Sequence, residues 1–198
     1  MVTKHHTPDR KLALGTYSKH APLLHFPVIE FPTGSYAMTT TSQTSRLTAA
    51  IVNPLMGSTR DVFTMMLVCE PVRESLTLRN SKVPAYDLSA VIGITGGATG
   101  TVVFSVARQT ALNIVERMLG MKVEEVNADV LDAVGEITNM IAGSAKAKFA
   151  SLNLSISTPN IISGSNHEIH YPTSIQPICL NYQSDVGKFC LEAGFAPA

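Results

Sequence analysis

The stretch "ITNMIAGSAKAKF", Ile137 to Phe149, decides the fold because a second copy of it lies earlier in the chain. The segment "IVNPLMGSTRDVF", Ile51 to Phe63, lies 86 positions upstream and has Ile, Asn, Gly, Ser and Phe at the same places. Apolar positions agree as well, since Leu55 corresponds to Ile141. We interpret the match as the duplication of one helical segment.

A second block of sequence repeats at nearly the same distance. "AVIGITGGATGTVVFSV" (Ala90 to Val106) aligns with "PICLNYQSDVGKFCLEA" (Pro177 to Ala193), 87 positions later. Each block has two apolar runs around a turn, which predicts two β-hairpins. The turn "GGATG" lacks the Lys-Ser/Thr ending and the following helix of a phosphate-binding loop, so we do not interpret it as one.

The spacing of apolar residues predicts the remaining elements. Helices are expected at about 50–69, 108–119 and 128–150, with Gly120 ending the second. Strands are expected near 72–79, 88–95, 100–106, 155–163, 175–182 and 187–194. The fold class is therefore α+β: a tandem repeat of two helix-plus-three-strand units, about 50–120 and 128–196, which form a shared, largely antiparallel sheet flanked by long helices.

Composition excludes several classes of function. Lysine plus arginine equal aspartate plus glutamate at 15 each, so the chain lacks the basic field that nucleic acid or an anionic membrane requires. No window reaches the roughly 18 apolar residues that span a bilayer, and the N-terminus lacks the apolar region of a signal peptide. Three cysteines within apolar runs are typical of buried thiols in a reducing compartment. We expect a cytoplasmic protein.

The N-terminal segment differs from the rest of the chain. Residues 1–48 mix His, Pro, Thr and Ser without periodicity, which predicts a flexible leader before a single domain at 49–198. Met38 is a possible true start of the protein.

The second long helix should present two contrasting faces. One stripe is apolar and should pack on the sheet: Leu131, Val134, Ile137, Ile141 and Ala145. The opposite ridge is polar or small and should face solvent: Asp132, Glu136, Asn139, Gly143 and Lys146. Glu136 and Asn139 are three residues apart and therefore adjacent on this ridge.

The ridge has two interpretations. It is either the solvated face of an amphipathic helix or a surface for a partner. Solubility explains the charged residues, but not Gly143, because glycine in a helix interior costs roughly 0.5–1 kcal/mol relative to alanine. Either the missing side chain lets a partner approach Asn139, or Gly143 serves close packing within the molecule.

Asn139 has a side chain suited to positioning. A carboxamide does not accept a proton at neutral pH, but it donates and accepts hydrogen bonds at once and can orient a water molecule. Such orientation suits phosphoryl hydrolysis, where catalysis is mostly alignment and charge stabilisation. Glu136 could then dock against a cation of the partner.

The residues "DAVGEITNMIAGSAKAKF" resemble the CheX branch of the CheC/CheX/FliY chemotaxis phosphatases, whose signature is Glu-x-x-Asn on a long exposed helix. The resemblance extends to "NPLMGSTRDVFTMM", "VIGITGGATGTVVFSV", "TALNIVERMLG" and "TPNIISGSNH", and so covers most of the chain from about residue 50. It implies a CheC-like fold, a homodimer, and a phosphatase of the phospho-aspartate of a CheY-like response regulator.

The resemblance also implies roles for single residues. Asn139 would orient the hydrolytic water in the regulator's active site, and Glu136 would pair with the regulator's lysine. Asp132, Gly143 and Lys146 would contact the same partner. The Mg²⁺ ion would sit in the regulator's carboxylate pocket, so this chain would bind no metal or other cofactor.

The first copy lacks half of this signature. Asn53 corresponds to Asn139, but Ala50 stands where Glu136 stands in the second copy, and Pro54 follows directly. Because proline restricts the residue before it, we interpret the first copy as inactive scaffold.

Two other functions are considered. The same ridge could bind a receiver domain or a flagellar-switch component without chemistry, as an adaptor. "HEIH", with His167, Glu168 and His170, has metal-compatible spacing, but two further ligands are not apparent, which favours a surface loop or strand edge.

Overall fold

The computed structural model describes residues 36–149, 152–171 and 175–197, which form three helices and seven strands. The helices are α1 (Tyr36–Leu67), α2 (Arg108–Leu119) and α3 (Ala128–Ala147). The strands are β1 (Val72–Leu78), β2 (Leu88–Thr95), β3 (Ala98–Val106), β4 (Ser155–Ile156), β5 (Asn160–Ser163), β6 (Ile178–Ser184) and β7 (Gly187–Pro197). This order contains the predicted repeat of helix and strands, and the α+β fold class is confirmed.

The seven strands belong to one antiparallel sheet in which the two repeats exchange strands. The order is β1-β6-β7-β3-β2-β4, and β5 also pairs with β2. The hairpins β2–β3 and β6–β7 lie at the centre, joined by the pairing of β3 with β7. The first strand of each repeat lies on the hairpin of the other, because β1 pairs with β6 while β4 and β5 pair with β2. Each repeat therefore completes the sheet of its neighbour.

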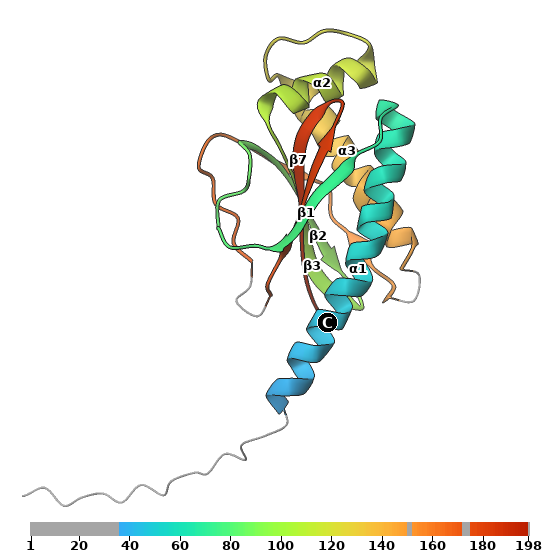
Figure 1. The fold of residues 1–198 in the computed structure, drawn as a ribbon, viewed down its shortest axis with the longest axis vertical. Helices are drawn as coiled ribbons and strands as arrows, with labels where there is room; N and C mark the ends of the chain where they lie inside the picture. The colour runs from blue at the N-terminus through green and yellow to red at the C-terminus, as the bar shows by residue number, and fades with distance from the viewer. Residues whose placement is uncertain (1–35, 150–151, 172–174, 198) are drawn as a thin grey trace, which may run out of the picture. The chain divides into compact units, whose positions relative to one another are not determined.

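Helices cover one face of the sheet and bury an aromatic cluster. Figure 1 shows α1 and α3 side by side along this face, with α2 near one end. The ring of Phe63 on α1 stacks on Phe189 of β7 at 4.5 Å, and Phe104 of β3 lies 5.3 Å from Phe189. Tyr182 of β6 stacks on the same ring at 4.9 Å. Aromatic pairs of this kind add about 0.5–1.5 kcal/mol each beyond their buried area.

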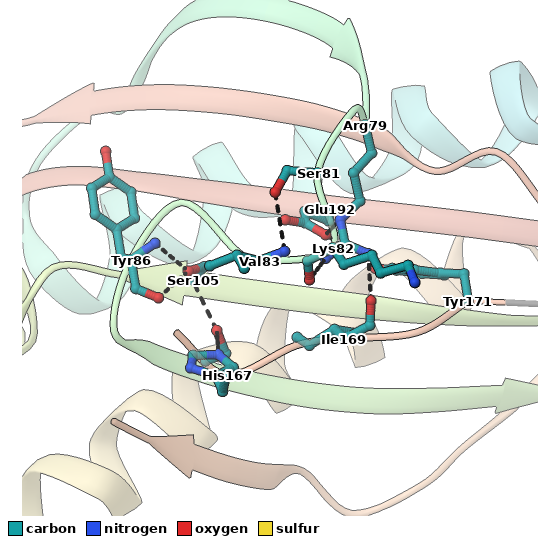
Figure 2. A network of polar contacts seen from close by, with 11 residues as sticks. Arg79, Ser81, Lys82, Val83, Tyr86, Ser105, His167, Ile169, Tyr171 and Glu192 are labelled. Carbon is teal, nitrogen blue, oxygen red and sulfur yellow. Dashed lines mark hydrogen bonds and ion pairs between the residues drawn. The ribbon is translucent and has the colours of Figure 1, made fainter. Parts of the chain in front are cut away.

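The opposite face of the sheet is polar and is covered by loops. Because side chains alternate along a strand, Leu191 and Ala193 point into the helix-covered core, while Cys190 and Glu192 point away from it. Segments 79–87 and 164–171 cross this second face, and Figure 2 shows their polar side chains gathered over the strands. Hydrogen bonds connect these segments to the sheet, among them one from Tyr86 N–H to Ser105 Oγ and one between His167 Nε2 and Ser89 Oγ.

Several predicted boundaries are confirmed. Helix α2 spans the predicted residues 108–119, and it ends at Gly120, whose φ of 67° is left-handed and whose N–H donates to Glu116 O. Strand β2 spans the predicted residues 88–95.

Three expectations need correction. Helix α1 begins at Tyr36 instead of about residue 50, so the segment 36–48, predicted within the leader, is helical. The strand expected at 155–163 is two short strands separated around Pro159, which has no N–H for a ladder. Leu131 is only half-buried, whereas Ala133 of the same helix is buried. Residues 1–35 lie outside the described residues, and the flexible leader there and the start at Met38 stay predictions.

Among the described residues, no helix combines the length and the apolar character needed to cross a membrane.

Candidate active site on helix α3

The predicted polar ridge lies along one side of α3. Asp132, Glu136 and Lys146 are exposed, and Asn139 and Gly143 are half-buried between them and the rest of the molecule. All five residues of this ridge therefore face outward as the helical period predicts. We use "the α3 ridge" for these five residues.

The buried side of α3 fixes the direction in which the ridge points. Val134, Ile137 and Ile141 have no exposed surface and pack in the core against the sheet and the other helices. Burying side chains of this size contributes about 1.5–3 kcal/mol each, so rotation of the helix about its axis is opposed by several kcal/mol. Thr138, which is also buried, donates a hydrogen bond from Oγ1 to Val134 O at 2.6 Å, so its hydroxyl is paired within the helix.

The start of α3 is capped by its own side chain. Asn127 has extended backbone geometry, and its Oδ1 accepts a hydrogen bond from Val130 N at 3.1 Å. Asp129 lies in the first turn, where a negative charge interacts favourably with the helix dipole. These contacts fix the helix one turn before Asp132.

The two glycines of α3 have different surroundings. A Cβ on Gly135, which is buried, would lie 3.4 Å from Ile161 Cδ1 and 3.9 Å from Pro159 Cβ, which are ordinary contacts with the β4–β5 segment. A Cβ on Gly143 would meet only Ile156 Cδ1, at 3.9 Å, which is an ordinary contact. Packing within the described molecule therefore does not require glycine at 143. This favours the interpretation that the gap faces a partner.

Shallow depressions flank the ridge. One lies between the end of α2 and the start of α3, and its lining includes Glu136 and Asp132. The other lies beside Gly143 and Lys146 near the end of α3. The first is lined by Met118, Leu119, Asp129, Asp132, Ala133 and Glu136. A partner that covers Glu136 would therefore also cover apolar side chains of α2.

Charge is divided along the ridge. The half near the N-terminus of α3 is acidic, with Asp129, Asp132 and Glu136, and the C-terminal end has Lys146 and Lys148. Lys148 Nζ pairs with Asp61 Oδ2 of α1 at 3.0 Å and so connects the two long helices. Among the described residues, Asp129, Asp132 and Glu136 take part in no ion pair. Glu136 and Asp132 are thus available to a cation of a partner.

The equivalent position on α1 is different. Asn53 is exposed, whereas its counterpart Asn139 is half-buried, and Ala50 is exposed where the second copy has Glu136. Helix α1 continues through Pro54, which has no N–H to donate to the preceding turn. The first copy therefore presents the carboxamide of Asn53 without a carboxylate at the position equivalent to Glu136.

The histidines of "HEIH" do not converge. Both ring nitrogens of His167 are engaged, Nδ1 with Gly164 O at 2.8 Å and Nε2 with Ser89 Oγ at 2.9 Å. His170 lies elsewhere and pairs with Glu168 at 2.9 Å. His167 therefore fastens the segment 164–171 to the sheet.

Sequence patterns missed two groups of residues that the fold brings together. Met118 and Leu119 of α2 line the depression beside Glu136, and Leu119 is 49% exposed. An apolar residue directly before the helix-ending Gly120 was the available signal. Cys179 and Cys190 approach each other on the far face of the sheet; the hairpin was predicted, but its exact register, which brings the two together, was not.

Comparison with known proteins supports the resemblance to the CheX family. Residues 88–183 match the family model described as chemotaxis phosphatase CheX. A "CheY-P phosphatase CheX" from Thermotoga maritima is 35% identical over 125 residues, which are 61% of this chain and 80% of that protein.

This chain belongs to the CheX family.

Solved structures of CheX proteins agree with the fold. A crystal structure of CheX from Desulfovibrio desulfuricans is 31% identical, with a TM-score of 0.67, and the match covers 75% of this chain and 99% of that one. CheX in a CheX-CheY-BeF3-Mg²⁺ complex from Borrelia burgdorferi is 19% identical, with a TM-score of 0.62 over 74% of this chain and 96% of that one. The second likeness shows the fold alone.

Proposed function

We propose that this CheX-family protein hydrolyses the phospho-aspartate of a CheY-like response regulator. The observation that carries the proposal is the pair Glu136 and Asn139, adjacent on the exposed side of α3. The 35% identical relative named as a CheY-P phosphatase supports the same activity.

Asn139 has the role of positioning the attacking water. Phosphoryl transfer passes through a loose transition state, so alignment of the nucleophile and stabilisation of charge supply most of the catalysis. The Asn139 carboxamide can accept a hydrogen bond from water through Oδ1 while Nδ2 donates to an oxygen of the phosphoryl group. Since this amide does not titrate near neutral pH, it orients the water without removing a proton.

Glu136 has the role of docking. Its carboxylate lies one turn before Asn139 and makes no ion pair with another described residue. It can therefore pair with the lysine of a receiver domain and align Asn139 with the phosphorylated aspartate. Asp132, Gly143 and Lys146 extend the contact on both sides.

Magnesium belongs to the partner in this proposal. In the Borrelia burgdorferi complex a protein of the same fold is combined with CheY, BeF3 and Mg²⁺, and we extend a metal-loaded receiver to this chain as part of the proposal. The ion would neutralise the phosphoryl group from the receiver's carboxylate pocket, and the α3 ridge would add the water-orienting amide.

The test is phosphate release from a CheY-like receiver charged with a small phosphodonor in the presence of Mg²⁺. Wild-type protein should accelerate release above the receiver's own rate. Asn139→Ala should remove at least about 100-fold of that acceleration, the scale seen for a transition-state hydrogen-bond donor, and keep binding to the phosphorylated receiver. Glu136→Ala should weaken binding as well.

Each variant is compared with Asn53→Ala, which removes the equivalent carboxamide of the first copy and should leave release unchanged. If Asn139→Ala releases phosphate at the wild-type rate, the mechanism is wrong. If wild-type protein binds the phosphorylated receiver without accelerating release, the α3 ridge is the docking surface of an adaptor.

The protein is further proposed to act as a homodimer through the edge strand β1. Strand β1 pairs only with β6, so one side of its backbone is unpaired among the described residues. Val72, Leu76 and Leu78 of this strand are 65%, 45% and 55% exposed, which is unusual for an edge strand that faces water. A second copy would cover these side chains and pair the backbone.

A further inference from the structure

Two cysteines and a glutamate converge on the loop-covered face of the sheet, away from the α3 ridge. Cys179 lies on β6, and Cys190 and Glu192 lie on β7. One ligand atom from each of the three, two thiols and a carboxylate oxygen, all lie within 4.8 Å of one another. Cys190 and Glu192 are buried, and Cys179 is half-buried.

Strand register explains why the sulfurs meet. Cys179 pairs with Glu192, and Asn181 pairs with Cys190, so the two cysteines are diagonal neighbours on one face of the β6–β7 hairpin. Diagonal positions of antiparallel strands lie about 7–8 Å apart at Cα, which is longer than most disulfides span. A metal ion bridges a wider gap, because thiolates of a tetrahedral zinc site bind at about 2.3 Å and lie about 3.8 Å apart.

The groups around the cluster hold Glu192 in place. Arg79 Nε lies 2.9 Å from Glu192 Oε2, with side chains that are 7% and 3% exposed. The N–H of Nε does not point along this line, so the contact is an ion pair without an aligned hydrogen bond. The Tyr171 hydroxyl donates to the same oxygen at 3.4 Å, and Arg79 lies 5.0 Å over the Tyr171 ring. Both contacts use Oε2, which leaves Oε1 as the candidate ligand.

The charges of this buried site suit a divalent cation. With two neutral thiols, Arg79 and Glu192 sum to zero, and a divalent ion that displaces two thiol protons leaves that sum unchanged. Replacing two thiol protons by a divalent ion therefore adds no net charge to the buried site, and its desolvation cost is lower than that of an uncompensated charge.

We infer that Cys179, Cys190 and Glu192 form a binding site for a thiophilic metal ion such as Zn²⁺, held in place by Arg79 and Tyr171. Two thiolates and one carboxylate form a ligand set that selects soft or borderline ions over Mg²⁺. Arg79 also donates from Nη1 to Ile169 O at 2.7 Å, so the ion would be coupled to the segment 164–171. Figure 2 shows Arg79, Tyr171, Ile169 and Glu192 together at this place.

This site is distinct from the phosphatase proposal. The ligands lie on the sheet face opposite the helices, and the inferred ion departs from the expectation that this chain binds no metal. The inferred ion is structural, joining β6 and β7 beneath the loops.

The test is a titration of the full-length, reduced and metal-free protein with Zn²⁺ in competition with a chromogenic chelator, and with Co²⁺ as a spectroscopic probe. Wild type should bind one equivalent, show a sulfur-to-cobalt charge-transfer band and release two protons per ion near neutral pH. Cys179→Ser should weaken binding at least about 10-fold and diminish the band.

Cys69→Ala is the matched control, because Cys69 is buried in the helix-covered core and should leave binding and band unchanged. Asn139→Ala should also bind as wild type, which separates this result from any outcome of the phosphatase assay. Cys179→Ala serves as a second variant should Cys179→Ser fold poorly. Absence of saturable binding would overturn the inference, and so would binding without a thiolate band, which would place the ion on histidines.

Discussion

Gly143 is a residue whose missing side chain the described fold does not use. Replacing glycine by alanine in a helix interior stabilises the helix by roughly 0.5–1 kcal/mol. Gly143→Ala should therefore raise the free energy of unfolding by about that amount, since the new methyl group meets only Ile156 at 3.9 Å. The same methyl group should impede a receiver at Asn139 and lower the rate of phosphate release. Urea unfolding and the release assay measure the two effects on one sample.

Gly57 supplies the control for this prediction. It occupies the equivalent place in α1, where a Cβ would meet only the flexible end of Lys148 at 3.4 Å. Gly57→Ala should stabilise the protein similarly and leave phosphate release unchanged. Full activity of Gly143→Ala would show that a partner does not approach the helix at that position.

Tyr182 makes stability depend on alkaline pH. Burial raises the pKa of Tyr182 to about 12, from an ordinary value of 10.0. Below pH 10 both states keep the phenol proton, but between pH 10 and 12 the unfolded chain loses it first, so this part of the stability falls as pH rises. A shift of this size corresponds to at most roughly 3 kcal/mol.

Tyr182→Phe should therefore reduce the loss of stability between pH 10 and 12. At neutral pH we expect little loss, because the buried hydroxyl has no hydrogen-bond partner among the described residues and the ring still stacks on Phe189. Urea unfolding of both proteins at pH 8, 10 and 11 measures the difference. Parallel stability curves for the two proteins would contradict the assigned cause.

Single residues show what local sequence can and cannot predict. Glu136 and Asn139 follow from helical periodicity, which places i and i+3 on one face wherever the helix packs. Leu119 lies beside Glu136 only because α2 packs against α3, and Cys179 meets Cys190 only because β6 and β7 adopt one register. Helix packing is set by contacts distant in sequence, and the register of a hairpin depends on the geometry of its turn, which the apolar pattern alone does not specify.

Helix caps give a prediction about α2 and α3. Asn127 caps α3 through its side chain, whereas Ala107 at the start of α2 has extended geometry and no side-chain cap. Asn127→Ala should cost about 1 kcal/mol, and Ala107→Ser should gain about 0.5–1 kcal/mol. Thermal unfolding measures both, and the combined variant should lie near wild type because the caps belong to different helices. Equal destabilisation by both changes would contradict the cap assignments.

Two elements show why some predicted boundaries were wrong. The segment "MTTTSQTS" lacks helix periodicity, yet neither Pro nor Gly occurs between Tyr36 and Asn53 to end a helix. Threonine and serine cost at most about 0.7 kcal/mol each relative to alanine, which does not stop a helix that has already begun. In the strand expected at 155–163, Pro159 interrupts the pairing because proline has no N–H to donate to a neighbouring strand.

Assembly can be tested through strand β1. A lysine on an exposed sheet edge opposes pairing with another chain, because pairing would bury its charge. Leu76→Lys should convert the proposed dimer to monomer, or weaken it at least about 10-fold, without changing the fold. Sedimentation equilibrium of both proteins measures this. Leu119→Lys is the control, since it places the same charge on an exposed leucine of α2. An unchanged dimer in Leu76→Lys would move the interface elsewhere.

The exchange of first strands makes the two repeats inseparable. A chain cut in the segment between α2 and α3 would leave each fragment a hairpin whose outer partner, β1 or β4 with β5, belongs to the other fragment. Neither fragment could complete its sheet alone, but the two together could rebuild the whole. The protein thus resembles two subunits joined in one chain: deleting the half without the Glu-x-x-Asn pair would leave the other half without the strand that completes its sheet.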